Sequence, residues 1–319
     1  MARVTGNRYR SQGRLSHAVY PVPQPVDRLN PIPPEGNSEF CVTDDYAAHM
    51  TLITRFAPSP TGYLHLGHAF SALTAFDTAR VDGGRFILRI EDIDNTRCRP
   101  HFETAIYEDL SWLGITWPQP VLRQSEHISD YQDALETLRR LGVIYPDHRT
   151  RKSQVEAALS APQGEVPEPS GEIAENPAWR LSLDAARSWL GARYDHLAFP
   201  EMLFRPGRHA ALPEVNGDVV LGRKDIGIAY HLAVVIDDAR QGITDIVRGH
   251  DLFDATHTQV LLQALLDLPT PRYHHHALLL DSEGRRLAKR KGSKSLRDYR
   301  ADGVSAAEIK TMIADTSKA

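Results

Sequence analysis

Cysteine is scarce in this 319-residue sequence. The only two are Cys41 and Cys98, and their surroundings differ. Two isolated cysteines predict neither the disulfide framework of a small secreted domain nor a thiolate metal site. We therefore expect a protein of a reducing compartment, the cytoplasm.

Long apolar runs and an excess of positive charge are absent as well. No stretch approaches the ~20 apolar residues of a membrane span, and the N-terminus lacks the continuous apolar core of a signal peptide, so no membrane partner is expected. The net charge is −4, which argues against a protein that nucleic acid attracts by bulk charge. Any RNA contact then needs a local basic face, for which residues 289–300 are a candidate.

Apolar periodicity is missing from residues 1–49. Four arginines precede any acidic residue, and six prolines follow between positions 21 and 34. This composition predicts a disordered extension. Two explanations stay open, an organellar transit peptide or a natural start of translation at Met50, and peptides from residues 2–49 in mass spectrometry would rule out the second.

Residues 54–68 are the most informative stretch of the chain. Pro58 and Pro60 prevent a continued strand, and Gly62 permits a turn of either hand, so a strand must end here and a helix begin. Apolar residues then recur at helical spacing, which predicts a helix whose apolar stripe packs on a sheet. The stripe consists of Leu66, Ala69, Phe70, Leu73 and Phe76.

The start of this helix is a candidate phosphate site. Free backbone N–H groups and the positive end of the helix dipole favour an anion there, and His65 and His68 project beside them. Gly67 lies between the two histidines, where the missing Cβ would let a base or a ribose approach the backbone.

Three later segments predict strands of a parallel α/β sheet. Residues 85–90 are followed by Glu91, residues 230–238 form an apolar run that ends in two aspartates, and residues 242–251 carry Arg248 near their end. In open α/β sheets the ligand lies at the carboxyl ends of the strands. We therefore expect these charged residues to face a ligand.

The sequence from Arg55 to His68, Arg-Phe-Ala-Pro-Ser-Pro-Thr-Gly-x-Leu-His-Leu-Gly-His, resembles the first signature of the glutamyl class I aminoacyl-tRNA synthetases. The resemblance covers about residues 51–295. It implies a Rossmann-like nucleotide-binding domain with an inserted α+β subdomain that faces tRNA. The implied divisions are an extension at 1–49, catalytic halves at 50–120 and 218–282, the insertion at 121–217, and a lysine loop with a short helical tail at 283–319.

The resemblance also implies roles for individual residues. Arg55 and Arg248 match residues that grip the side-chain carboxylate of glutamate, and Glu91 matches the acid that receives its α-ammonium group. Tyr230 and Ser59 match polar residues of the same pocket. The signature residues Phe56, Ala57 and Pro58 complete it, and Ala57 contributes only its backbone. ATP would lie against His65, Gly67, His68 and Lys289, with Mg²⁺, and Lys289, His65 and His68 would act in catalysis.

The lysine loop can be placed in two registers. An Asp-x-x-Gly turn at 281–284 precedes residues 286–290, which is the order in the glutamyl enzymes, and we prefer this register with Lys289 in the main role. Arg286 and Ala288 then replace the usual lysine and serine. The alternative is the Lys-Gly-Ser-Lys-Ser sequence at 291–295.

A zinc site of many relatives is not expected here. Those relatives carry a Cys-x-Cys pair where this chain has Asp147 and Arg149. Zinc needs about four suitable ligands, mostly thiolate or imidazole, so we predict no zinc.

Only 29 residues follow Arg290, whereas full glutamyl-tRNA synthetases continue with a large anticodon-binding region. This resembles the glutamyl-queuosine tRNA(Asp) synthetases, which activate L-glutamate with ATP and attach it to the queuosine base at the wobble position. The resemblance implies a ligase, expected to be a monomer, whose partner is the anticodon stem-loop of tRNA(Asp) bearing queuosine. The base for the transfer step, and whether the host makes queuosine, stay open.

Three alternatives are kept. The first is a truncated glutamyl-tRNA synthetase that charges the tRNA 3′ end, and the second is a non-catalytic synthetase paralogue that binds RNA. The third, a small-molecule adenylyltransferase, shares the His-x-Gly-His site but lacks the sequence blocks around Tyr230 and Arg248.

Overall fold

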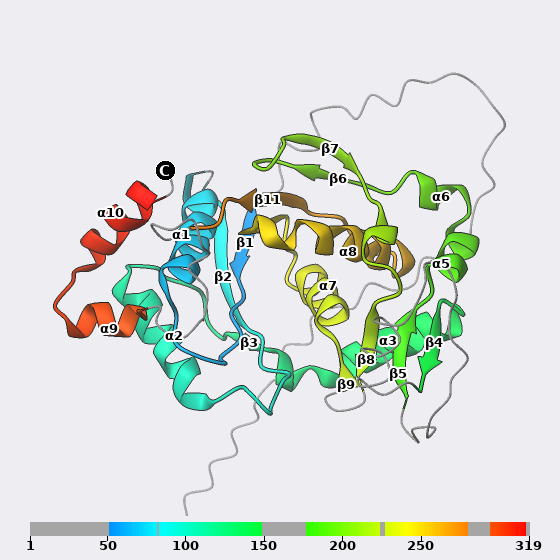
Figure 1. Ribbon diagram of the computed structural model, residues 1–319, viewed down its shortest axis with the longest axis horizontal. Coiled ribbons are helices and arrows are strands. Elements are labelled where there is room, and N and C mark those ends of the chain that lie inside the picture. The colour runs from blue at the N-terminus through cyan, green and yellow to red at the C-terminus, as the bar shows by residue number, and fades with distance from the viewer. Residues whose placement is uncertain (1–50, 82, 149–176, 224–226, 280–293, 317–319) are drawn as a thin grey trace, which may run out of the picture. The chain divides into compact units, whose positions relative to one another are not determined.

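The computed structural model describes residues 51–81, 83–148, 177–223, 227–279 and 294–316 (Figure 1). The predicted extension at 1–49, the lysine loop at 286–290 and Arg149 lie outside the described residues.

Strands and helices alternate through most of the described chain. The strands are β1 (Ile53–Phe56), β2 (Arg85–Ile90), β3 (Leu122–Arg123), β4 (Ile144–Asp147), β5 (Ala178–Leu181), β6 (Ala198–Glu201), β7 (Gly207–Ala210), β8 (Val220–Arg223), β9 (Gly227–Ile228), β10 (Asp245–Gly249) and β11 (Arg272–His276). The α-helices are α1 (Leu66–Val81), α2 (Pro100–Trp112), α3 (Ile128–Arg140), α5 (Leu183–Leu190), α6 (Ala192–Asp195), α7 (Tyr230–Arg240), α8 (Phe253–Leu265), α9 (Leu296–Ala301) and α10 (Ala306–Thr316).

Parallel strands form the centre of the structure. β1 pairs with β2 and β2 with β3, while β10 pairs with β11 and β11 with β6, all in parallel; β7 is the antiparallel edge. The two sets meet at β1 and β10, because the Thr244 N–H donates to the carbonyl oxygen of Ile53 at 3.1 Å and the Ile53 N–H donates to Thr244 Oγ1 at 2.8 Å. The carboxyl ends of β1 and β10 therefore lie together, as the sequence predicts.

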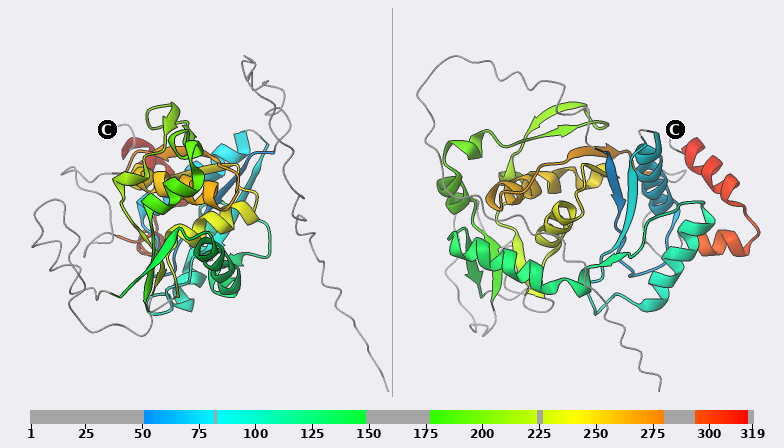
Figure 2. Two further views of the ribbon diagram at one scale, coloured as in Figure 1. Left: turned by 90° about the vertical axis from the view of Figure 1, so that its right-hand side faces the viewer. Right: turned by 180° about the vertical axis from the view of Figure 1, so that it is seen from behind.

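The strands separate two apolar cores. Alternate residues of a strand point to opposite faces: Phe86 and Leu88 of β2 pack in the core with α1, whereas Ile87 packs in the core with α7 and α8. Figures 1 and 2 show α1 on one side of β1 and β2 and α7 on the other. The same alternation turns Arg55 and Arg89 toward α7, where their side chains meet Asp238.

Helix α1 buries a different face from the one its large apolar residues predict. Its buried residues are alanines, at positions 69, 72, 75 and 79, and Phe70, Leu73 and Phe76 are only partly buried. Small side chains let the helix approach the sheet closely, and Thr54 Oγ1 of β1 donates to the carbonyl oxygen of Ala75 at 2.8 Å. Only Ala69 belongs to both the predicted and the observed buried face.

The predicted strand at 230–238 is wrong, because this segment is helix α7. Its apolar residues Leu232 to Val235 are each at most 2% exposed, since the helix packs within a core. An unbroken apolar run of this length suits a buried helix as well as a buried strand. Because the segment is a helix, Asp237 and Asp238 lie in its last turns and point into the protein, not to a strand end.

The range predicted as an insertion, 121–217, contributes to more than one sheet. β4 and β5 of this range form an antiparallel sheet with β8 and β9, which follow it in the sequence. β3 and β6, from the same range, hydrogen-bond to β2 and β11. Residues of this range therefore reach the central parallel strands at both ends.

The tail helix α9 is tied to the start of α1. Ser295 forms a capping box with Asp298, and Ser295 pairs with His65 in an isolated β-bridge. The Leu296 N–H donates to the carbonyl oxygen of Leu64 at 2.8 Å. None of the helices in the described ranges combines the length and apolar character needed to cross a membrane.

Candidate active site

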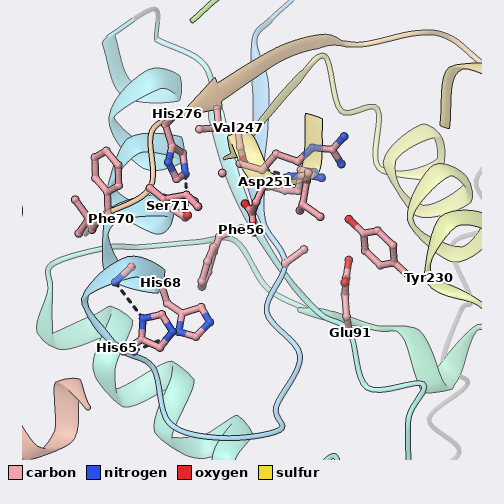
Figure 3. Close-up of a pocket in the computed structure, with 18 residues that line it drawn as sticks. Phe56, His65, His68, Phe70, Ser71, Glu91, Tyr230, Val247, Asp251 and His276 are labelled. Atoms are coloured by element: carbon pink, nitrogen blue, oxygen red, sulfur yellow. Dashed lines mark hydrogen bonds between the residues drawn. The ribbon is translucent and has the colours of Figure 1, made fainter. Parts of the chain in front are cut away.

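A cavity of about 490 Å³ opens at the carboxyl ends of β1 and β10 (Figure 3). It gathers residues from β1, β10 and β11, from the segment after β2, and from α1 and α7. Nine of the site residues predicted in the sequence analysis line it: Arg55, Phe56, Ala57, His65, Gly67, His68, Glu91, Tyr230 and Arg248.

Three predicted site residues are not part of this lining. Pro58 is buried outside it, and its carbonyl oxygen accepts the Glu91 N–H at 3.1 Å, so it holds a lining residue in place. Ser59 is exposed, and its side chain does not reach the cavity wall. Lys289 lies outside the described residues.

The two signature histidines are oriented by backbone N–H groups. The Gly67 N–H donates to Nδ1 of His65 at 3.1 Å, and the His65 N–H donates to Nδ1 of His68 at 3.2 Å. A ring nitrogen that accepts a hydrogen bond carries no proton, so each neutral ring keeps its proton on Nε2. The ring centroids lie 3.8 Å apart, so the two imidazoles lie together in the cavity lining. The Gly67 N–H itself is committed to His65.

A buried charge network includes Arg55 and Glu91 of the cavity lining and continues into the protein. Arg55 donates to both carboxylate oxygens of Asp238, from Nε at 3.1 Å and from Nη2 at 3.3 Å. Arg89 is fully buried and donates from Nη1 to Asp238 at 2.7 Å and from Nη2 to Glu91 at 3.1 Å. Burial favours a higher pKa for Asp238, but Arg55 and Arg89 outweigh it and lower its pKa. Asp237 receives hydrogen bonds from Gln124 and Tyr131.

Glu91 and Tyr230 project toward the same side of the cavity from different elements (Figure 3). Burial raises the pKa of Glu91, although Arg89 and Arg55 oppose the shift. A cation brought next to this carboxyl would favour its ionised form. The pair therefore suits an ammonium group.

Arg248 is bound differently from Arg55. It is 5% exposed and donates from Nε to His275 at 3.1 Å and from Nη2 to Thr256 Oγ1 at 2.7 Å. Nη1 is buried and has no hydrogen-bond partner among the described residues. A guanidinium that lines a cavity and keeps an unsatisfied nitrogen is suited to an incoming carboxylate.

Several lining residues were missed by the sequence analysis. Ser71 donates from its hydroxyl to Nε2 of His276 at 2.8 Å, because Nδ1 of His276 donates to the carbonyl oxygen of Ala277. Ser71 lies one helical turn after Gly67 and His68. This spacing places it on the same face of the helix and could have predicted it as a site residue. The remaining missed residues are Phe70, Val247, Gly249, Asp251, Leu252, Leu278 and Leu279.

Metal ligands do not cluster in the described part of the chain. No group of three or more His, Cys, Asp or Glu residues there is arranged to hold a metal ion. Asp147, at a cysteine position of many relatives, is buried and accepts from Arg180 Nε at 2.5 Å. Its carboxylate is thus committed to an ion pair.

Comparison with known proteins gives a consistent result. A family model described as tRNA synthetases class I (E and Q), catalytic domain, matches residues 51–170 and 207–314. The chain is 47% identical over 283 residues to a protein of Rhodobacter capsulatus named glutamyl-Q tRNA(Asp) synthetase, an alignment that covers 82% of this chain and 99% of the relative. A protein of the same name from Symbiobacterium thermophilum is 42% identical, with 80% and 83% covered.

Other relatives carry a different name. Glutamate–tRNA ligase 1 of Ruegeria pomeroyi is 37% identical, and the alignment covers 82% of this chain but 60% of the ligase. A crystal structure of a glutamate tRNA ligase from Elizabethkingia meningosepticum in complex with its amino acid is similar, with a TM-score of 0.61 and 28% identity over 80% of this chain and 53% of that chain. The predicted α/β class I synthetase catalytic fold is confirmed, and the chain belongs to the family of class I tRNA synthetases of the E and Q group.

Proposed function

We propose that this chain is a ligase that activates L-glutamate with ATP and transfers the glutamate to the queuosine base at the wobble position of tRNA(Asp). One observation carries the activation step: a single cavity is lined by Arg248, which suits a side-chain carboxylate, by Glu91, which suits an ammonium group, and by His65 and His68, which suit a phosphate. The choice of acceptor rests on the names of the relatives at 47% and 42% identity.

In the first step, the α-carboxylate of glutamate attacks the α-phosphorus of ATP, which gives glutamyl-adenylate and releases pyrophosphate. The protein need only hold the reactants in line and stabilise the charge on the phosphoryl oxygens. His65 and His68 would donate from Nε2, the N-terminus of α1 would supply its dipole, and Lys289 would supply a positive charge. ATP would lie along Gly67.

Glutamate would be recognised at both ends. Arg248 would receive the side-chain carboxylate on its unsatisfied Nη1, and Glu91 beside Tyr230 would receive the α-ammonium group. Arg55 would contribute less directly, because Asp238 already occupies two of its donors. A positively charged fork favours a carboxylate over the neutral amide of glutamine.

Magnesium fits the same site as a companion of ATP. Mg²⁺ at such sites takes most ligands from water and phosphate oxygens and needs only one or two carboxylates from the protein. Of the two described lining residues that carry carboxylates, Glu91 is assigned to the ammonium group, and Asp251 would therefore serve the ion. When bound, the ion would offset phosphate charge; we propose no zinc, in keeping with Asp147.

In the second step, a hydroxyl of the queuosine ring would attack the activated carbonyl group of glutamyl-adenylate, which forms an ester and releases AMP. The anticodon stem-loop must then reach the same cavity. We assign no described side chain as the base.

We further propose that the protein acts as a monomer in the cytoplasm. Light scattering at micromolar concentration would check the oligomeric state, and cell fractionation would check the location.

The test combines two assays. Glutamate-dependent ATP–pyrophosphate exchange, measured with and without tRNA, checks activation. Transfer of labelled glutamate is then compared between tRNA(Asp) with queuosine, the same tRNA without it, and tRNA(Glu). Nuclease digestion must locate the label, since periodate attacks both the terminal ribose and the queuosine diol. Label at the anticodon supports the proposal.

Other results would support the alternatives. Label at the 3′ end would identify a glutamyl-tRNA synthetase, an activity that the 37% identical ligase name makes the nearest competitor. Absence of exchange under every condition, together with binding of tRNA, would instead indicate a non-catalytic paralogue.

A further inference from the structure

We propose that Glu201 and His275 are positioning residues that orient Arg248 for the side-chain carboxylate of glutamate and thereby sharpen the choice of glutamate over glutamine. The inference rests on the proposed function and extends its site by two residues from outside the cavity wall. Glu201 lies at the end of β6 and His275 in β11, and each is 1% exposed.

Glu201 is held as a carboxylate by four hydrogen bonds. Its Oε1 accepts the N–H groups of Leu203 at 2.9 Å, Phe204 at 2.8 Å and His275 at 3.1 Å, and its Oε2 accepts from Nδ1 of His275 at 2.5 Å. Burial by itself would raise the pKa of Glu201, but these hydrogen bonds outweigh it and lower the pKa to about 2. The residue is therefore a fixed negative charge.

The hydrogen bonds also determine which nitrogen of His275 carries the proton. The guanidinium of Arg248 can only donate, so Nε2 of His275, which lies 3.1 Å from Arg248 Nε, must be the acceptor. Nδ1 then carries the proton and donates to Glu201. Burial lowers the pKa of His275, and Arg248 adds to this, although Glu201 opposes it. The ring is thus a neutral link between an acid and an arginine.

Two of the three nitrogens of Arg248 are fixed, one by this link and one by Thr256. His275 accepts from Nε, and Thr256 Oγ1 accepts from Nη2 at 2.7 Å. The guanidinium also lies against the Tyr273 ring, with Cζ 5.3 Å from the centroid. A planar group held at two nitrogens and one face has a defined orientation, so Nη1 remains for a ligand.

The arrangement differs from that of Arg55 in how the charge is balanced. Asp238 pairs directly with Arg55 and occupies its donors. At Arg248 the negative charge of Glu201 lies beyond a neutral imidazole, and no described carboxylate forms an ion pair with the guanidinium. Glu201 thus orients Arg248 through His275 and does not occupy the position of a substrate carboxylate.

Two substitutions remove the acceptor for Arg248 by different routes. In Glu201→Gln the amide oxygen can still accept the three backbone N–H groups, but the new NH₂ faces Nδ1–H of His275. Moving the ring proton to Nε2 relieves that clash and turns an N–H toward Arg248. In His275→Asn the shorter side chain places its amide near the position of Nδ1. No acceptor is then left at the position of Nε2, where Arg248 donates. His275→Gln is the conservative partner, because its amide oxygen reaches the level of Nε2.

Glutamate-dependent ATP–pyrophosphate exchange on the full chain provides the readout. Glu201→Gln and His275→Asn are each expected to raise the KM for glutamate about tenfold, the effect of losing one buried charge-assisted hydrogen bond. The KM for ATP should change by less than about twofold. The ratio of kcat/KM for glutamate to that for glutamine should fall by a similar factor of about ten, and His275→Gln should recover most of both losses.

His274→Asn is the matched control. His274 is the preceding residue of β11, and its Nε2 pairs with Asp245 Oδ1 at 2.7 Å on the other side of the strand. It does not line the cavity, so its variant should keep the wild-type KM and selectivity. Thermal unfolding measures whether each variant is folded. If either Glu201→Gln or His275→Asn is unstable, the remaining one tests the positioning role, because both remove the same acceptor for Arg248.

The outcomes separate the two proposals. Suppose that the wild type is active and that Glu201→Gln or His275→Asn is folded. If the KM for glutamate and the selectivity are then unchanged, the positioning role is overturned and the proposed function stays intact. A wild type with no glutamate-dependent exchange, with or without tRNA, overturns both.

Discussion

Arg55 and Asp238 lie 183 positions apart in the chain and form a two-point ion pair, with Nε–Oδ1 at 3.1 Å and Nη2–Oδ2 at 3.3 Å. Both side chains are at most 5% exposed. The pair joins β1 to α7, and Asp238 also accepts from Arg89 of β2 at 2.7 Å. One carboxylate thus connects strands β1 and β2 with helix α7, which lies far from them in the sequence.

Asp238→Asn should lower the free energy of unfolding by about 3–5 kcal/mol. The substitution leaves two buried guanidinium groups without their shared charge, and breaking a buried pair has a cost of about that size. Urea denaturation followed by circular dichroism measures it. Asp302→Asn is the control, because Asp302 pairs with Lys294 at the surface and is 61% exposed, where an ion pair contributes about 1 kcal/mol or less. Equal effects of the two variants would contradict the prediction.

Lys289→Ala should lower ATP–pyrophosphate exchange by about 10²-fold or more, judging from other preorganised charge contacts. Lys294→Ala tests the alternative register of the lysine loop. Lys294 pairs with Asp302, the residue that follows α9, and lies 4.5 Å from the centroid of the Tyr299 ring. Its charge is thus engaged within the tail, and its removal should change exchange less than about threefold. A larger loss with Lys294→Ala than with Lys289→Ala would favour the register at 291–295.

Gly249→Ala should narrow the cavity. A Cβ at this position would lie 2.5 Å from Asp251 Oδ1 and 2.8 Å from Leu278 Cδ2, and both of these residues line the cavity. Their side chains must move, and a shift of about 1 Å can cost up to about 10²-fold in rate. We expect roughly a tenfold loss of kcat/KM in the exchange assay with a melting temperature close to wild type. Wild-type kinetics would show that the two side chains move aside without consequence.

Acid should weaken the fold partly through Glu201. Its pKa is lowered from 4.5 to about 2 in the folded protein, so the unfolded chain takes up the proton first as the pH falls. The stabilisation is complete above pH 4.5 and is lost toward pH 2, an effect of about 3 kcal/mol. The difference in unfolding free energy between wild type and Glu201→Gln should therefore shrink as the pH falls below 4.5. A difference that does not vary with pH would contradict the low pKa.

Much of the site follows from local sequence patterns. The proline-rich turn before His65, the strand before Glu91 and the strand that carries Arg248 each have a signal within about ten residues. Because strand ends share one edge of a parallel sheet, these segments predict a common site without any knowledge of the chain path. Five lining residues are predicted in this way: His65, Gly67, His68, Glu91 and Arg248. The other four, Arg55, Phe56, Ala57 and Tyr230, follow only from the family resemblance.

The errors arise where tertiary packing decides. The apolar run after Tyr230 has no period that distinguishes a buried helix from a buried strand. The sequence therefore predicts Asp237 and Asp238 at the end of a strand, whereas they lie at the end of a helix. The link from Glu201 to His275 spans 74 positions. No local pattern marks either residue, because their roles exist only once β6 and β11 are adjacent.

The alanine face of α1 limits how this protein can vary. Because methyl groups set the distance between the helix and the sheet, a larger side chain at positions 69, 72, 75 or 79 would push the helix outward and carry His65 and His68 away from the strand ends. These four alanines touch no substrate in the proposed site, yet they set its dimensions. In laboratory evolution of this chain, we expect them to resist substitution as strongly as the histidines, while exposed Asp77 on the same helix changes freely.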